Sequence, residues 1–270
     1  MSPDESPAGI VEPEPLIPDY PVLWQLRISH FNEKARWALD YKNVPHRRRS
    51  LVPGRHSLRS RRLGGKGTTP LLVADGSVFG DSTEIVAELE RRYPDPPLYP
   101  DTEVDRKAAL ELEDHFDREL GPQIRSALFA ALIDDRRITV DLFWQGQPRR
   151  ERAIVTALWP LLKVAIRRTM PADPESERKG REATISALEL IESELNGDYL
   201  VGDRFSVADL TAAALLFPLV APPQFAYWLP DAWPDEWEQF RRSLSGRRAY
   251  QWVLAMFARY RGTSAAVSDD

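Results

Sequence analysis

Two hydrophobic patterns alternate along the first third of the chain. VLWQL at 22–26 is short and largely apolar, which predicts a buried strand. FNEKARWALDYKNV at 31–44 repeats its apolar residues close to a helical period, and Pro45 predicts the end of that helix. A second extended segment is expected near 48–52. The order so far is strand, helix, strand.

A hairpin and another helix are predicted next. LLVA at 71–74 and SVF at 77–79 flank Asp75-Gly76, a dipeptide typical of two-residue β-turns. Apolar residues then recur on one face of a segment from 82 to 92, which predicts a helix. The connection at 53–69 is polar, basic and glycine-bearing, with room for a short helix.

Beyond this point every long segment has a helical pattern. YPDPPLYPDTEVD at 93–105 contains four prolines and no period, so it reads as a linker. Helices are expected near 104–133, 148–169, 176–195, 206–217, 234–244 and 247–260. Ser206 and Asp209 fit a helix cap, and the helix that follows them is apolar nearly all round, which predicts a central position.

The pattern therefore predicts a small α/β domain followed by a larger all-α domain. The expected boundaries are a disordered proline- and acid-rich tail at 1–20, the α/β domain at 21–93, the linker at 94–105, the helical domain at 106–262 and a frayed tail at 263–270.

Composition narrows the chemistry. The chain has no cysteine, which excludes disulfides, thiolate metal sites and a mechanism based on its own thiol. Its four histidines show no metal-ligand spacing, so no metal is expected. A net charge of -5 gives no general attraction to nucleic acid or to a membrane, and neither is expected as a partner. No apolar run is long enough for a membrane span, and no secretory signal pattern begins the chain.

Three segments in order resemble the glutathione S-transferase family: SHFNEKARWAL at 29–39, TTPLLVADGSVFGDSTEIVAEL at 68–89 and YLVGDRFSVADL at 199–210. The resemblance covers roughly 22–262. It implies a thioredoxin-like α/β N-terminal domain (βαβ-ββα, a mixed four-stranded sheet), an all-α C-terminal domain, glutathione as co-substrate, a homodimer and a cytoplasmic location. The same fold also serves proteins without catalytic activity.

The resemblance assigns two pairs of residues to glutathione. Thr69 would precede a cis proline, Pro70, and present its backbone to the tripeptide; the alternative is a trans proline that opens an edge strand. Asp81 would pair with the ligand's ammonium group, and Ser82 with its γ-glutamyl carboxylate at a helix N-terminus. Plain helix capping by this pair, with Glu84 completing a capping box, is the other interpretation, and the two are compatible.

The resemblance places Ser29 where serine-type members stabilise the thiolate of glutathione. His30 stands where many members have proline, which is a departure from the pattern. Asn32 is a rival thiol donor, and both Ser29 and Asn32 can also be helix caps. His56 and Lys66 are candidates for the glycyl carboxylate; the alternative is two exposed basic residues on a loop.

Two further features stay open. The cation-rich stretch 46–62 fits a solvated face, an anion-steering surface or a macromolecular contact. Residues near Phe116, Leu120 and Ile124, and the aromatic run at 225–233, are candidates for the wall of an electrophile site. The segment 134–152 is long for the family and would lengthen two helices or form a lid.

The function predicted from these residues is conjugation of glutathione to a small apolar electrophile. A non-catalytic binding or scaffold protein and a glutathione-dependent isomerase or dehalogenase are the alternatives.

Overall fold

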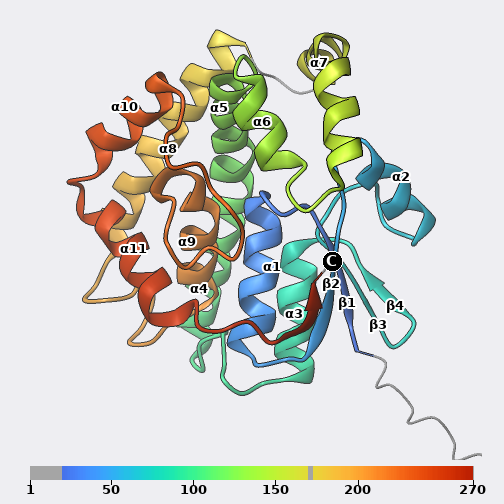
Figure 1. Cartoon of the computed structure of the whole chain (residues 1–270). Helices are drawn as coiled ribbons and strands as arrows, with labels where there is room; N and C mark the ends of the chain where they lie inside the picture. Colours follow the sequence, from blue (N-terminus) through green and yellow to red (C-terminus); the bar gives the residue numbers. More distant parts are fainter. Residues whose placement is uncertain (1–19, 170–172, 270) are drawn as a thin grey trace, which may run out of the picture.

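A five-stranded mixed sheet forms the N-terminal part of the computed structural model, which describes residues 20–169 and 173–269 (Figure 1). The strand order is β4-β3-β1-β2-β5. β1 and β2 are parallel, and β3 and β4 form the predicted hairpin. The strands are β1 (Val22–Gln25), β2 (His46–Ser50), β3 (Leu71–Ala74), β4 (Ser77–Phe79) and β5 (Ala266–Asp269). The expected tail at 1–20 lies outside the described residues except for Tyr20.

The fifth strand corrects the prediction of four strands and of a frayed C-terminus. β5 pairs in parallel with β2 and covers an edge that the first four strands leave open. Just before it, the Ala265 amide donates to the Asp40 carboxylate at 2.8 Å. The polar sequence of the tail gave no sign of this pairing, because the partners that hold it lie more than 200 residues away.

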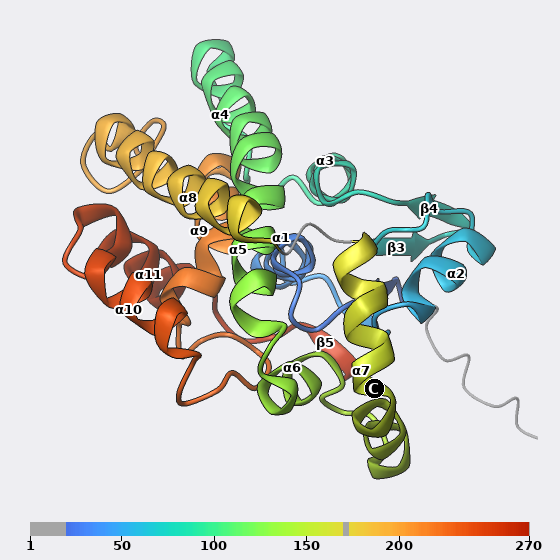
Figure 2. The same cartoon turned by 90° about the horizontal axis from the view of Figure 1, so that it is seen from above.

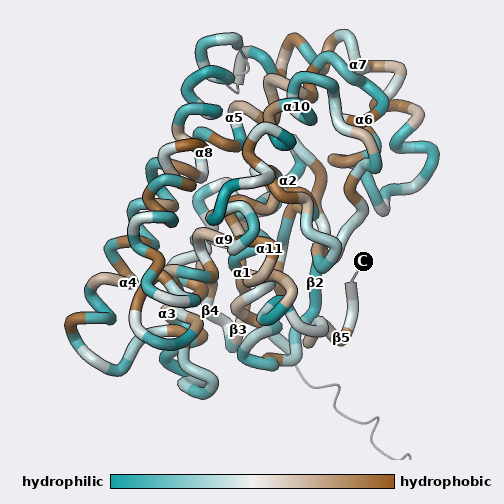
Figure 3. The backbone as a smooth tube through the Cα atoms, turned by 90° about the vertical axis from the view of Figure 1, so that its left-hand side faces the viewer, coloured by the Kyte–Doolittle hydropathy of each residue, from teal (hydrophilic) through white to brown (hydrophobic). Residues whose placement is uncertain are grey.

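Three helices accompany the sheet: α1 (His30–Tyr41), α2 (Arg55–Arg62) and α3 (Ser82–Arg92). α1 and α3 pack on each other, and α1 also packs on the helical half (Figure 2). β2 has the sequence HRRRS and is hydrophilic throughout (Figure 3). Because it has no apolar alternation, the sequence misplaced it by two residues, at 48–52.

The remaining helices form the C-terminal half: α4 (Glu103–His115), the π-helical turn η1 (Phe116–Leu120), α5 (Gly121–Leu132), α6 (Arg136–Phe143), α7 (Arg149–Thr169), α8 (Pro174–Glu194), α9 (Val207–Val220), α10 (Asp235–Leu244) and α11 (Arg248–Tyr260). The long helix predicted at 104–133 is thus α4 and α5 joined through η1. α6 had not been predicted as a separate helix.

α9 is the centre of this half, as its apolar sequence predicted. All of its residues are buried. The Asp209 carboxylate accepts hydrogen bonds from the backbone amides of Ser206 and Leu200, each at 2.8 Å, which completes the predicted capping box. Burial raises the pKa of Asp209 to about 6, against the opposing effect of these hydrogen bonds.

α6 and α7 form a small second core with the sheet half. Val52, Val140 and Trp159 are buried there, together with Ile133 and Trp144. The other side of α7 carries exposed apolar residues, among them Leu161 at 72% exposure. The segment 134–152 therefore forms a separate helix, α6, and the first residues of α7.

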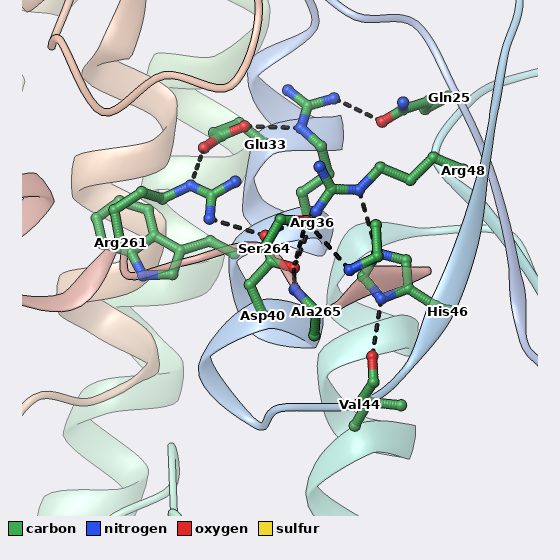
Figure 4. A network of polar contacts seen from close by, with 12 residues as sticks. Gln25, Glu33, Arg36, Asp40, Val44, His46, Arg48, Arg261, Ser264 and Ala265 are labelled. Carbon is green, nitrogen blue, oxygen red and sulfur yellow. Dashed lines mark hydrogen bonds and ion pairs between the residues drawn. The ribbon is translucent and has the colours of Figure 1, made fainter. Parts of the chain in front are cut away.

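A buried ionic network fastens the C-terminus to the sheet and to α1 (Figure 4). The Arg261 guanidinium binds Glu33 at 2.5 Å and Asp40 at 2.8 Å. Arg36 binds the other oxygen of Glu33 at 2.7 Å, and Arg48 donates two hydrogen bonds to Asp40 at 2.9 and 2.7 Å. All five side chains are at most 3% exposed, so each carboxylate is held between two cations away from water.

His46 completes the network as a neutral ring. The Arg48 Nε donates to His46 Nε2 at 3.1 Å, so that nitrogen must accept. The proton is then on Nδ1, which donates to the Val44 carbonyl at 2.8 Å. Burial lowers the pKa of His46 below its ordinary value, which agrees with this neutral form.

Candidate functional site

The N-terminus of α1 carries Ser29, the predicted thiol-activating residue. Ser29 is the N-cap, with extended backbone, and its Oγ accepts a hydrogen bond from the Asn32 amide at 3.4 Å. The side chain is only partly buried. Accepting this bond leaves the hydroxyl proton of Ser29 available to another acceptor. The capping interpretation is thus confirmed, and it is compatible with a role toward a thiolate, which stays a prediction.

Asn32 joins two of the predicted segments. Its side chain is fully buried; Nδ2 donates to Thr69 Oγ1 at 3.2 Å, and Oδ1 accepts from the Leu26 amide at 3.3 Å. The amide therefore holds the β1–α1 turn against the loop that precedes β3. This arrangement favours a positioning role for Asn32 over direct contact with a thiol.

Thr69 and Pro70 lie at the start of β3. The peptide bond between them is cis, as the resemblance implied, so the alternative of a trans proline is wrong. Pro70 is buried, whereas Thr69 is partly accessible next to Asn32.

Asp81 and Ser82 begin α3. The exposed Asp81 carboxylate caps the helix by accepting the Thr83 amide at 2.8 Å. Glu84 reaches back to the Gly80 amide at 3.2 Å, one residue before the amide that an ideal capping box would use. Ser82 is only 2% exposed, and within the described chain its hydroxyl has no hydrogen-bond partner.

A buried lysine fixes α3 relative to α1 and to the helical half. Lys34 Nζ contacts Glu113 at 2.8 Å, Asp117 at 2.6 Å and Thr83 Oγ1 at 3.1 Å. Thr83 Oγ1 also donates to Asp117 at 2.7 Å. Through Thr83, this cluster fixes the N-terminus of α3 against α1 and η1. Sequence reasoning missed it, because Lys34 has the polar signature of an exposed helix position.

The two basic candidates lie in different surroundings. Lys66 is 83% exposed and makes a loose ion pair with Glu84 at 3.8 Å, which brings it to the α3 N-terminus. His56 is on α2, half-buried, and its Nδ1 has no hydrogen-bond partner. Burial lowers the pKa of His56, so the ring is neutral at pH 7. α2 also borders the loop before Thr69, because a Cβ at Gly67 would lie 3.0 Å from Ser57 Oγ.

The departure at His30 is explained by packing. His30 is 3% exposed, lies against Phe31 at 4.5 Å between ring centroids, and faces α5. Burial and the positive charge of Arg125 lower its pKa to about 3, against a hydrogen bond to Gly121. At Gly121 a Cβ would lie 2.4 Å from the Phe31 ring, so the two helices touch closely here. His30 is therefore a neutral spacer between α1 and α5.

The cation-rich stretch 46–62 divides into separate roles. His46 and Arg48 belong to the buried network, and the Arg59 guanidinium lies over the Trp24 ring at 4.3 Å. Arg55 pairs with Glu151 of α7 at 3.2 Å. Much of the stretch is thus structural, which the sequence alone had not indicated.

The candidates for the electrophile wall also divide. Phe116, Leu120 and Ile124 are at most 1% exposed and belong to the core, so they do not line an open site. In the aromatic run at 225–233, the Tyr227 hydroxyl accepts from Gln25 Nε2 at 2.5 Å, and the Tyr227 ring lies 4.9 Å from the Arg36 guanidinium. The run therefore covers the end of β1.

The loop between α6 and α7 also reaches this place. Gln145 exchanges two hydrogen bonds with the Trp228 backbone, at 3.1 and 3.4 Å, and Arg27 donates to the Gln145 carbonyl at 3.4 Å. The Arg27 guanidinium occupies the space where a Cβ of Gly146 would stand, 2.0 Å away. The extra helices are thus attached next to the turn that carries Ser29.

No group of three or more histidine, aspartate or glutamate side chains suited to a metal occurs in 20–169 or 173–269. Over the same ranges, no helix combines the length and the apolar content needed to cross a bilayer.

Comparisons with known proteins agree with this geometry. The family model for the glutathione S-transferase N-terminal domain matches residues 23–97, and that for the C-terminal domain matches 155–234. A search of curated proteins found no significant match.

Solved structures share the fold at low identity. Glutathione transferase GSTFuA2 from Phanerochaete chrysosporium has a TM-score of 0.62 at 17% identity, over 91% of this chain and 100% of that one. The transferase CsGST63524 of Ceriporiopsis subvermispora, solved with glutathione, has 0.57 at 17%, over 91% and 99%. The β-etherase LigF from Sphingobium sp. strain SYK-6 has 0.56 at 20%, over 87% and 98%. With both domain models matched in order on the sheet and helices described above, the chain belongs to the glutathione S-transferase family.

Proposed function

We propose that the protein binds glutathione at the meeting of α1, the Thr69 loop and α3, and transfers it to a small apolar electrophile. The observation that carries the proposal is the buried Asn32 amide, which hydrogen-bonds Thr69 at 3.2 Å and so joins the turn of Ser29 to the predicted tripeptide site. Membership of the family and a neighbour solved with glutathione support the choice of ligand.

Under this proposal, the predicted binding residues would hold different groups of the tripeptide. The Thr69 backbone would pair with the peptide backbone of glutathione. The buried but unpaired Ser82 hydroxyl and the α3 N-terminus would bind the γ-glutamyl carboxylate, and the exposed Asp81 would bind the ammonium group. Lys66 would pair with the glycyl carboxylate, whereas His56, neutral at pH 7, would contribute a hydrogen bond only.

Ser29 would act on the sulfur. The thiol loses its proton to solvent, and the Ser29 hydroxyl donates a hydrogen bond to the thiolate, which favours that form. The sulfur lone pair then forms a bond to the electrophilic carbon, and the leaving group departs with the electrons of its own bond. An aryl ether oxygen as leaving group would give the type of reaction that the name β-etherase implies for one structural neighbour.

The test compares three variants at Ser29. Ser29→Ala removes the hydroxyl and the cap, Ser29→Asn keeps a capping side chain without the hydroxyl, and Ser29→Thr keeps both. With an activated aryl chloride as electrophile, we expect Ala and Asn to lose about 100-fold in kcat, while Thr retains most activity. Calorimetry should give a glutathione Kd within about threefold of wild type for all three, since the thiol contact adds little to ground-state affinity. Equal turnover in wild type and Ser29→Asn would contradict the role of Ser29.

The alternatives give different outcomes. No heat with millimolar glutathione would favour a non-catalytic scaffold protein. Binding without conjugation, together with turnover of a maleyl-type or haloalkane substrate, would favour the isomerase or dehalogenase. We also propose a homodimer, which light scattering after gel filtration would test, and a cytoplasmic location, which cell fractionation would test.

A further inference from the structure

A groove of about 360 Å³ lies between α6 and α7, and none of the candidate glutathione-binding residues lines it. Four arginines line it, Arg136 and Arg137 from α6 and Arg149 and Arg152 from α7, with one carboxylate, Asp141. The family models match residues 23–97 and 155–234, and of the residues that line the groove only Thr156 falls within them. The groove thus belongs to the part of the chain that sets it apart from the matched domains.

The charges of the groove are not balanced. Asp141 already forms a short ion pair with Arg152. Within the described residues, Arg136, Arg137 and Arg149 have no carboxylate partner, and four guanidinium groups against one carboxylate leave a net charge of +3. The chain as a whole carries -5, so this is a local excess opposite in sign to the rest.

Several surface arginines elsewhere in the described chain are neutralised within their own helix. On α3, Arg91 pairs with Glu88 at 2.8 Å, and on α10, Arg242 pairs with Glu238 at 2.8 Å. The same i, i+3 or i, i+4 spacing recurs on α8. Arg136, Arg137 and Arg149 lack such a partner among the described residues, although all three converge on one groove with Arg152.

The unpaired arginines also occupy unfavourable helix positions. Arg136 and Arg137 are the first two residues of α6, and Arg149 is the first of α7. The helix dipole makes this end positive, so cations in the first turn destabilise a helix. Local features that oppose stability in this way are typical of functional sites. Asp135 at the N-cap of α6 and Glu151 in the first turn of α7 offset part of this cost, and an anion in the groove would offset more of it.

We propose that the α6–α7 groove binds a small anion of phosphate type with two or more negative charges. Guanidinium groups bind phosphate oxygens through paired N–H donors, and four of them converge on a volume in the usual range of ligand sites. A free phosphate ester and a phospholipid headgroup present the same chemistry. The site is independent of the proposed transferase function.

The test uses inorganic pyrophosphate as the probe at low ionic strength. Calorimetry and thermal unfolding are measured for wild type, for Arg136→Gln/Arg137→Gln, and for a control with the same charge change, Arg91→Gln/Arg242→Gln. We expect pyrophosphate to bind and raise Tm in wild type and control. In the groove variant its affinity should fall at least tenfold, while Tm without ligand is unchanged or higher, because repulsion in the groove is relieved.

Sedimentation with vesicles separates the two sources of phosphate. Binding to phosphatidylglycerol vesicles, absent for phosphatidylcholine and lost in the groove variant, would identify a headgroup as the ligand. Pyrophosphate binding without vesicle binding would identify a free phosphate. No pyrophosphate binding by wild type, or equal binding by wild type and the groove variant, would overturn the proposal.

Discussion

Replacing Arg261 tests whether the buried network holds the C-terminus to α1. Arg261→Met keeps much of the apolar stem but removes the guanidinium that contacts Glu33 at 2.5 Å and Asp40 at 2.8 Å. Both carboxylates are fully buried, and removing one partner of a buried ion pair costs about 3–5 kcal/mol. Each retains a second cation, Arg36 or Arg48, and Arg261 Nη2 has no partner to lose. We therefore expect the lower limit, a loss of about 3 kcal/mol in the free energy of unfolding.

The pH dependence gives a second readout. Burial raises the pKa of Glu33 and of Asp40, but the neighbouring arginines outweigh it, with Arg261 first, and leave both pKa values below their ordinary ranges. A depressed folded-state pKa contributes stability above the unfolded pKa and loses it as pH falls through the folded pKa. Without Arg261 both values rise. The difference in the free energy of unfolding between wild type and Arg261→Met should therefore become smaller as pH falls below 4.

Urea unfolding followed by tryptophan fluorescence and circular dichroism measures both quantities. The control is Arg259→Met in the last turn of α11, where the pair with Asp198 is exposed, at 51% and 63%, and contributes little to stability. Adding Glu33→Gln to Arg261→Met should restore part of the loss, because it removes a buried charge that lacks its partner. If Arg261→Met unfolds within 1 kcal/mol of Arg259→Met, the network does not anchor the C-terminus.

Three further changes follow from the structure. His30 has a folded-state pKa of about 3, so between pH 6.5 and 3 the unfolded chain takes up a proton at this residue and the folded chain does not. The free energy of unfolding of wild type should therefore fall by about 2 kcal/mol between pH 7 and 5. Urea unfolding of His30→Gln should lack that loss, whereas the control His115→Gln, at an exposed site, should keep it. Deleting 264–270 removes β5 and the Ala265 hydrogen bond and leaves the edge of β2 unpaired. The free energy of unfolding should fall by about 1–3 kcal/mol, and light scattering should detect aggregation through this edge. Equal stability and solubility of the two proteins would contradict this. Asn32→Ala leaves the Leu26 amide without its acceptor and removes the hydrogen bond to Thr69. It should raise the glutathione Kd measured by calorimetry and lower the free energy of unfolding by about 1–3 kcal/mol. If neither quantity changes, Asn32 does not bridge the two segments.

Features with a local signal were predictable from the sequence. Asp75-Gly76 identified the β3–β4 hairpin, and Ser206 with Asp209 identified the start of α9, because turn and cap preferences depend on neighbouring residues. Ser29 and Asp81 were placed at helix N-termini for the same reason. The candidate site was therefore predictable as a set of positions along the chain.

What joins those positions was not predictable. Asn32 meets Thr69 across 37 residues, and Lys34 meets Asp117 across 83, and neither spacing has a periodic signature. Both are polar residues on a helix, a pattern that ordinarily indicates a solvent-exposed position, yet both side chains are fully buried.

The largest errors share a single physical cause. β2 and β5 were misread because His46, Arg48 and the C-terminal tail are polar, and sequence patterns assign polar residues to the surface. A charge can be buried when an opposite charge and hydrogen bonds compensate for the lost water. Here the Asp40 carboxylate pairs with the Arg48 and Arg261 guanidinium groups and accepts a hydrogen bond from the Ala265 amide. The partners that allow this burial are set by the tertiary fold, so hydrophobic periodicity cannot reveal them. The unpaired arginines of the α6–α7 groove are the complementary case, since there the fold brings cations together and the described chain supplies no acid to match them.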